Sequence, residues 1–288
     1  MEINSTLPVE NVATTTPTES TDVSLNFWGA AWLGLQFVWW QLLAALVVTL
    51  LGFYLYGMED EVANANLLGR VGIPLSFLVA TWILYKKRPL TATAFQWQPT
   101  FTRLVPLGTL ILFSITYVSS ELMTFLPSYD AMLASYREMF ANISPIGLLI
   151  GGVIVGPVCE EIIFRGIILE GLSKKYRSTV AIGISALIFG LVHLQPLQII
   201  GAFVAGLVFG WIYLKTQSLW IVILLHVANN AFSFALGDAA SESTRTVLGN
   251  DILYVGSFSV ALILAYLGYI GFQKVVNTVD KKTSTVNV

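Results

Sequence analysis

The chain has 288 residues, of which 56% are hydrophobic and only 11% are charged, and its mean hydropathy is +0.75. Soluble domains average about a quarter charged residues, so this composition excludes an ordinary soluble globular protein. A formal net charge of -2 offers no basic surface for nucleic acid, and the single cysteine, Cys159, excludes an intramolecular disulfide and a cysteine-built zinc cage. Cys159 is most simply a small buried apolar residue.

The first 25 residues are rich in Ser, Thr, Asn and acidic side chains and contain no Lys or Arg. A signal peptide would need a basic region here, so the composition predicts a disordered tail instead. Beyond the tail, apolar runs of membrane-spanning length recur along the chain. They predict an all-α polytopic membrane protein, a bundle of about eight transmembrane helices at 27–56, 67–85, 104–126, 146–169, 179–194, 197–214, 219–236 and 252–272.

The basic residues between these spans predict an orientation. Eleven of the 15 Lys and Arg fall on one side of an eight-span arrangement, namely Lys86, Lys87, Arg88, Arg103, Lys174, Lys175, Arg177, Lys215, Lys274, Lys281 and Lys282. The other side receives Arg70, Arg137 and Arg245. By the positive-inside rule the first side is cytoplasmic, so both termini are expected in the cytoplasm.

Two further features concern packing. Residues 127–142 place Met132, Tyr136 and Phe140 on one helix face, which predicts either an amphipathic helix in the external interface or an ordinary packed loop helix. Pairs of glycines four residues apart, at 152 and 156 and again at 206 and 210, favour close helix approach in lipid.

The most unusual stretch is Glu160-Glu161-Ile162-Ile163-Phe164-Arg165, inside the fourth predicted span. Each charged group at the centre of a membrane helix costs about 2.5–3.5 kcal/mol on insertion scales, so such groups are rare and usually functional. Glu161 and Arg165 are four residues apart and can form a structural ion pair on one helix face. That pair leaves Glu160, about 100° away around the helix, as the candidate functional carboxylate.

The only two histidines, His193 and His226, also fall in predicted spans, and Asn230 shares a helix face with His226. A helical rise of 1.5 Å per residue places Glu160, His193 and His226 roughly 12–20 Å below the cytoplasmic ends of their spans. The three spans can therefore bring these side chains together within the membrane.

Two kinds of chemistry suit this set. A carboxylate and an imidazole can take a proton from water, while a second imidazole and an amide donate to a developing oxyanion. Alternatively, Glu160, His193 and His226 resemble a zinc ligand set with one open position that activates water. Both routes predict hydrolysis of a carbonyl bond, with or without Zn²⁺.

The order Glu-Glu-xxx-Arg, Phe-xxx-His and His-xxx-Asn on separate spans resembles the CPBP group of intramembrane proteases, also called the Abi family. That family unites CAAX prenyl endopeptidases with bacterial proteins of bacteriocin processing and self-immunity. The resemblance implies that Glu160 and His193 activate the water and that His226 and Asn230 stabilise the oxyanion. It also implies supporting roles for Glu161, Arg165 and Phe189.

Composition and apolar runs predict a cytoplasmic tail (1–25), three spans (26–145) and an external loop, last span and tail (237–288), and the resemblance implies that the part between them (146–236) is the catalytic core. The expected partners are a peptide or protein substrate at the membrane, lipidated or not, and the bilayer of a bacterial cell. Two alternatives stay open, which are a binding protein for immunity or scaffolding and a proton-coupled transporter.

Overall fold

The computed structural model describes residues 24–90, 92–236 and 244–286, and these contain helices and no β-strand. The expected all-α polytopic fold is therefore confirmed. The helices before the central segment are α1 (Phe27–Tyr56), α2 (Glu61–Leu67), α3 (Ile73–Lys87), α4 (Phe101–Met123) and α5 (Tyr129–Ala141), with a π-helical segment η1 (Leu68–Gly72) and a short 3₁₀ turn η2 (Ala92–Phe95). The expected disordered tail covers residues 1–25, of which 1–23 lie outside the described part. Leu25 contradicts the prediction, because it is buried in the core and donates its backbone N–H to the Gly171 carbonyl at 2.8 Å.

The central segment, Pro145–Ser173, is a continuous helix whose hydrogen-bonding pattern alternates between α and π. Its parts are α6 (Pro145–Gly147), η3 (Leu148–Val155), α7 (Gly156–Glu161), η4 (Ile162–Leu169) and α8 (Glu170–Ser173). The remaining helices are α9 (Ser178–Leu191), α10 (Pro196–Thr216), α11 (Leu219–Leu236), α12 (Thr244–Leu248) and α13 (Asp251–Val286). π-helical turns are frequent at functional sites, and here they flank the two adjacent carboxylates on α7.

Seven of the described helices are long and apolar enough to span a membrane, and α9, with 14 residues, is a shorter apolar helix. The expected bounds of the first and seventh spans coincide with α1 and α11. The second span is longer than predicted, because the helix already begins at Glu61. The fifth ends at Leu191 rather than at 194, because Leu194 has a positive φ of 61° and Pro196 begins the next helix.

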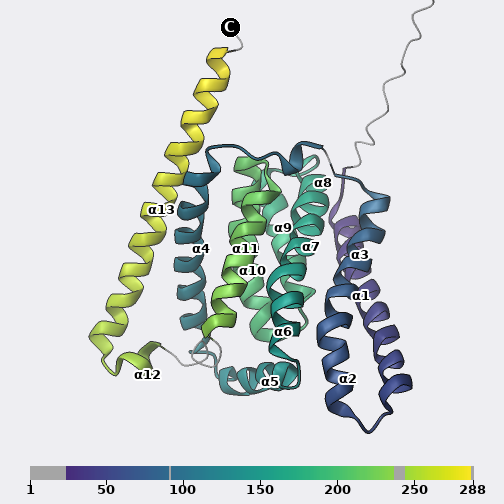
Figure 1. Ribbon diagram of the computed structural model, residues 1–288. Helices are drawn as coiled ribbons and strands as arrows, with labels where there is room; N and C mark the ends of the chain where they lie inside the picture. Colours follow the sequence, from purple (N-terminus) through teal and green to yellow (C-terminus); the bar gives the residue numbers. More distant parts are fainter. Residues whose placement is uncertain (1–23, 91, 237–243, 287–288) are drawn as a thin grey trace, which may run out of the picture.

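The helices form one bundle in which α9 packs on α10, α13 on α4, and α1 on α3 (Figure 1). The central segment lies between the α1–α3 pair and the group formed by α9, α10 and α11 (Figure 1). α8 and the described end of α13 lie at one end of the bundle, and α5 and α12 lie at the other. The connections between helices therefore lie at the two ends of the bundle in the arrangement that the basic residues predict.

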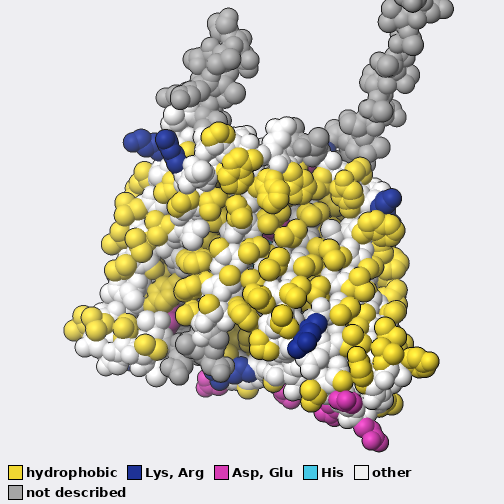
Figure 2. Space-filling model, viewed as in Figure 1, with side chains coloured by type: hydrophobic (Ala, Val, Ile, Leu, Met, Phe, Trp, Pro, Cys, Tyr) yellow, Lys and Arg dark blue, Asp and Glu magenta, His cyan; other side chains and the backbone are white. Residues whose placement is uncertain are grey.

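The surface of the bundle is that of an integral membrane protein. Figure 2 shows hydrophobic side chains over most of one face, with the majority of charged side chains gathered near its two ends. α5 lies across one end of the bundle rather than along it, and none of its residues is fully buried (Figure 1). The helix expected within 127–142 is therefore present, and Gln195 attaches it by donating from Nε2 to the Met132 carbonyl at 3.1 Å.

Glycines permit close helix approach at most of the expected positions. A Cβ on Gly206 would lie 3.1 Å from Ala186, and a Cβ on Gly210 would lie 3.2 Å from Ile182. A Cβ on Gly156 would lie 2.8 Å from a carbonyl oxygen of its own helical segment. Gly152 is different, because a Cβ there would meet nothing within 4 Å. At Gly152 the absence of a side chain is therefore not what permits a close approach, and the residue meets α11 through its carbonyl oxygen instead.

Candidate functional site

Three helical elements bring the predicted polar residues together near the middle of the bundle. Glu160 and Glu161 are the last two residues of α7. At a rise of 1.5 Å per residue, they lie about 20 Å from either end of the helical segment Pro145–Ser173. His226 is buried in α11, and His193 lies in the turn that follows α9. The expectation that His193 sits within a helical span is thus corrected, since α9 ends two residues before it.

Glu160 faces both histidines. Its Oε2 lies 3.6 Å from Nε2 of His226, and its Oε1 lies 4.0 Å from Nε2 of His193. These separations are longer than hydrogen bonds, so neither imidazole is hydrogen bonded to the carboxylate of Glu160. The residue as a whole is 8% exposed. The expected convergence of these three side chains is confirmed, while their catalytic roles stay a prediction.

The other nitrogen of each imidazole is held by an acceptor. His193 Nδ1 lies 2.8 Å from the carbonyl oxygen of Phe189, one turn earlier in the chain. Because a carbonyl oxygen only accepts, Nδ1 carries a proton and Nε2 of the neutral ring has a free lone pair. His226 Nδ1 lies 2.7 Å from Oε1 of Glu161, which fixes the same tautomer when that carboxylate is ionised. Both Nε2 atoms therefore face Glu160 with the same chemistry.

Glu161 and Arg165 form the ion pair that their spacing predicts. Arg165 Nη1 donates to Glu161 Oε1 at 2.9 Å, and both side chains are 0% exposed. Arg165 Nη2 also donates to the Gly206 carbonyl at 3.2 Å, which ties the central segment to α10. Since Glu161 Oε1 also accepts from His226, the pair connects directly to the candidate site. Sequence reasoning missed this contact, because 65 residues separate its two partners.

Aromatic rings enclose the charged pair. The guanidinium carbon of Arg165 lies 4.4 Å from the ring centroid of Phe189 and 5.1 Å from that of Phe209. Phe189 also makes edge contacts with both imidazoles, at centroid distances of 5.0 and 5.9 Å. Phe209 stacks on the imidazole of His226 at 4.9 Å. Phe209 was not identified from the sequence, where it is one more apolar residue in an apolar helix.

Asn230 is not hydrogen bonded to the Glu160 group. Its Nδ2 donates to the Gly152 carbonyl at 3.0 Å, and its Oδ1 accepts from Asn229 at 3.3 Å. An amide nitrogen carries two protons, so one remains for a substrate. The predicted oxyanion role of Asn230 stays a prediction. Cys159, beside Glu160 in the chain, is free and buried.

The zinc alternative depends on whether the donors converge. Two Nε2 lone pairs and a carboxylate are chemically suited to Zn²⁺, and each Nδ1–H has the acceptor that a ligating histidine usually has. Within residues 24–90, 92–236 and 244–286, however, no group of three or more His, Cys, Asp or Glu is arranged to hold a metal ion. The zinc alternative therefore stays a prediction, and Glu160, His193 and His226 are the residues that would hold the ion.

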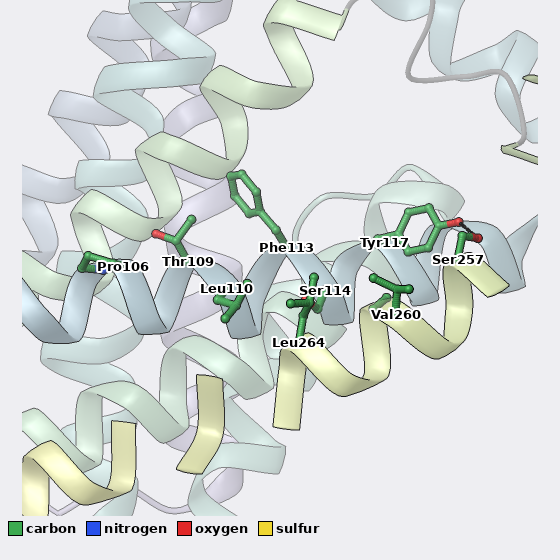
Figure 3. Close-up of a pocket in the computed structure, with 10 residues that line it drawn as sticks. Pro106, Thr109, Leu110, Phe113, Ser114, Tyr117, Ser257, Val260 and Leu264 are labelled. Atoms are coloured by element: carbon green, nitrogen blue, oxygen red, sulfur yellow. Dashed lines mark hydrogen bonds between the residues drawn. The ribbon is translucent and has the colours of Figure 1, made fainter. Parts of the chain in front are cut away.

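One surface hollow lies away from these residues. It has a volume of about 420 Å³, lies between α4 and α13, and is lined by apolar side chains together with Thr109, Ser114, Tyr117 and Ser257 (Figure 3). Tyr117 and Ser257 bridge the two helices through a 2.6 Å hydrogen bond between their hydroxyl groups. None of the Glu160 group lines this hollow, so it is separate from the candidate catalytic site.

Fold and site together define an integral membrane protein whose described residues are helical and group a carboxylate and two imidazoles near the middle of the bundle. Comparison with known proteins gives a family resemblance for part of the chain. Residues 142–232 match the family model described as type II CAAX prenyl endopeptidase, Rce1-like. This segment carries all three motifs, so the comparisons support the resemblance to CPBP proteases that the motifs predict.

A curated relative also matches part of the chain. The "Putative membrane peptidase YdiL" of Bacillus subtilis (strain 168) is 38% identical over 85 residues, which are 30% of this chain and 35% of the relative. The matched part thus spans about a third of that protein's length. No solved structure is significantly similar to the chain.

Proposed function

We propose that the protein is an intramembrane endopeptidase that hydrolyses a peptide bond of a membrane-associated or lipidated substrate. The observation that carries the proposal is the position of Glu160. It is a buried carboxylate at mid-membrane depth, with two Nε2 atoms 3.6 and 4.0 Å away and no hydrogen bond within the described residues. Such a carboxylate is free to bind and deprotonate a water molecule.

The first step uses Glu160 and His193. A water held between the carboxylate and the lone pair of His193 Nε2 loses its proton to one of them as its oxygen attacks the carbonyl carbon of the scissile bond. The Phe189 carbonyl supports this role, because it fixes the proton of His193 on Nδ1. A positioned general base of this kind contributes typically 10²–10⁴-fold to the rate.

The second group stabilises the resulting oxyanion. His226, when protonated, presents Nε2–H on the side that faces Glu160, and Glu161 holds the opposite nitrogen. The second amide proton of Asn230 is the other candidate donor. When the tetrahedral intermediate collapses, the C–N bond breaks and the proton taken from water passes to the leaving amine. The products are a carboxylic acid and an amine, and transfer of the acid proton to the amine gives a carboxylate and an ammonium group, so atoms and charge balance.

Reconstitution with a library of membrane-anchored peptides tests the proposal. Wild type, Glu160→Ala and Glu138→Ala are compared in liposomes, and cleaved peptides are identified by mass spectrometry. Glu138 is an exposed carboxylate on α5 and serves as the matched control. We expect cleavage by wild type and Glu138→Ala and a loss of at least 100-fold in Glu160→Ala. Full activity of Glu160→Ala would overturn the assignment.

A further inference from the structure

A second surface hollow, of about 470 Å³, lies between α1 and α3 and has a different character from the first. It is lined by Trp32, Leu35, Gln36, Trp39, Trp40 and Lys87. Trp32 and Trp39 are each 60% exposed, so the hollow opens at the surface of the bundle. Lys87 is the only charged side chain among the lining residues, and none of them belongs to the Glu160 group.

The hollow lies near the basic end of the bundle. The backbone N–H of Phe27, the first residue of α1, donates to the hydroxyl of Tyr176 in the basic connection 174–177. Gln36 follows nine residues later, about 13 Å farther along the helix. The headgroup layer of a bilayer is about 5–8 Å thick on each side. Gln36 therefore lies just below the expected headgroup level, where lipid phosphate and glycerol groups meet the hydrocarbon.

Lys87 is held in this position. Its ammonium donates to Gln36 Oε1 at 3.1 Å, although lysines at helix ends usually extend outward to water. Lys86 lies over the Trp82 ring at 5.6 Å, and Arg88 follows directly. Neither Lys86 nor Lys87 makes an ion pair with a carboxylate in the described part of the chain. Lys87 thus lines the hollow without a counter-charge, and Lys86 precedes it in the chain.

The tryptophans add a second recognition element. Indole rings prefer the level of lipid headgroups, because an apolar ring and an N–H donor suit that boundary. The Nε1–H of Trp40 is buried and has no hydrogen-bond partner among the described residues. A ligand for this hollow therefore needs an anionic group for lysine and an apolar part for the exposed rings.

We propose that this hollow binds an anionic phospholipid, whose phosphate pairs with Lys87 while its glycerol and upper acyl chains lie against Trp32 and Trp39. Charge complementarity selects this occupant, because a zwitterionic lipid brings its own cation to the uncompensated Lys87. A general aromatic belt would bind every lipid headgroup alike. The contact between Gln36 and Lys87 makes this hollow a defined site instead.

Native mass spectrometry of the detergent-purified full chain, titrated with phosphatidylglycerol or phosphatidylcholine, measures the preference. We compare wild type with Lys86→Gln/Lys87→Gln. The control Lys175→Gln/Lys215→Gln changes the charge equally at the same end of the bundle. We expect wild type and control to prefer phosphatidylglycerol and the first double variant to bind it at least tenfold more weakly.

Two outcomes would overturn the proposal. Equal binding of both lipids by wild type would show general adsorption, and equal losses in the two double variants would show that only total charge matters. Gln36→Leu provides a second, charge-neutral test, because it releases Lys87 without removing its charge. It should also weaken phosphatidylglycerol binding, and unchanged binding in a folded Gln36→Leu variant would contradict the defined site.

Discussion

Two adjacent carboxylates are predicted to respond in opposite ways to the same isosteric change. Glu160→Gln should abolish cleavage and leave the fold intact, whereas Glu161→Gln should destabilise the fold. The reason is their different surroundings. Glu160 has two imidazole nitrogens at 3.6 and 4.0 Å, beyond hydrogen-bond distance. Glu161 contacts Arg165 at 2.9 Å and His226 at 2.7 Å and is fully buried.

The magnitudes follow from these contacts. Loss of a general base costs 10²–10⁴ in rate, which is about 2.7–5.4 kcal/mol at 1.36 kcal/mol per tenfold. Glu160→Gln removes no hydrogen bond within the described residues, so its unfolding free energy should change by less than about 1 kcal/mol. Glu161→Gln leaves the fully buried guanidinium of Arg165 without its counter-charge, at a cost of about 3–5 kcal/mol.

Thermal unfolding in detergent, followed by tryptophan fluorescence, and peptide cleavage at the same pH measure the two effects. A double variant, Glu161→Gln/Arg165→Gln, completes the cycle and should be less destabilised than the sum of its single changes. The reasoning fails if Glu161→Gln unfolds at the wild-type temperature, or if Glu160→Gln proves the less stable of the two single variants.

The site and its scaffold give three further predictions. Asn230→Ala should lower the cleavage rate about 10²–10³-fold through loss of an oxyanion donor, while Asn229→Ala retains most activity; equal losses would argue against a specific role. Gly147→Ala should destabilise the bundle by about 1–3 kcal/mol in thermal unfolding, because its Cβ would lie 2.7 Å from the backbone of η1. Gly152→Ala, where a Cβ meets nothing within 4 Å, is its control, and similar unfolding temperatures would refute the packing argument. Cleavage should persist under strong chelation because the proposed base is Glu160 with His193; chelator-sensitive cleavage, with stoichiometric zinc that is lost in His193→Ala, would contradict this and favour the zinc alternative.

The sequence determined the membrane elements closely because a bilayer imposes a length on every apolar segment. It predicted the bounds of α1 and α11, where the apolar run and the helix end together. It placed the second span too late, since Asn64 and Asn66 interrupt the apolar run without interrupting the helix. A polar side chain changes hydropathy, but the backbone hydrogen bonds of a helix continue through it.

The ion pair between Glu161 and Arg165 was also available from sequence, because residues four apart on a helix must be neighbours. The meeting of Glu160 with two histidines followed only as an expectation from depth, and the structure brings them within 4.0 Å. The motifs within 142–232 indicated the reaction that these side chains would perform, which is hydrolysis of a peptide bond.

Only the tertiary structure decided how each group is held. The stacking of Phe209 on His226, the hydrogen bond from His226 to Glu161 and the attachment of α5 through Gln195 all join separate helices. The sequence of a single helix specifies which residues share a face, but not which ring nitrogen or aromatic ring meets that face from a neighbouring helix. Those contacts depend on how the helices rotate and cross when they pack, and therefore on the whole bundle.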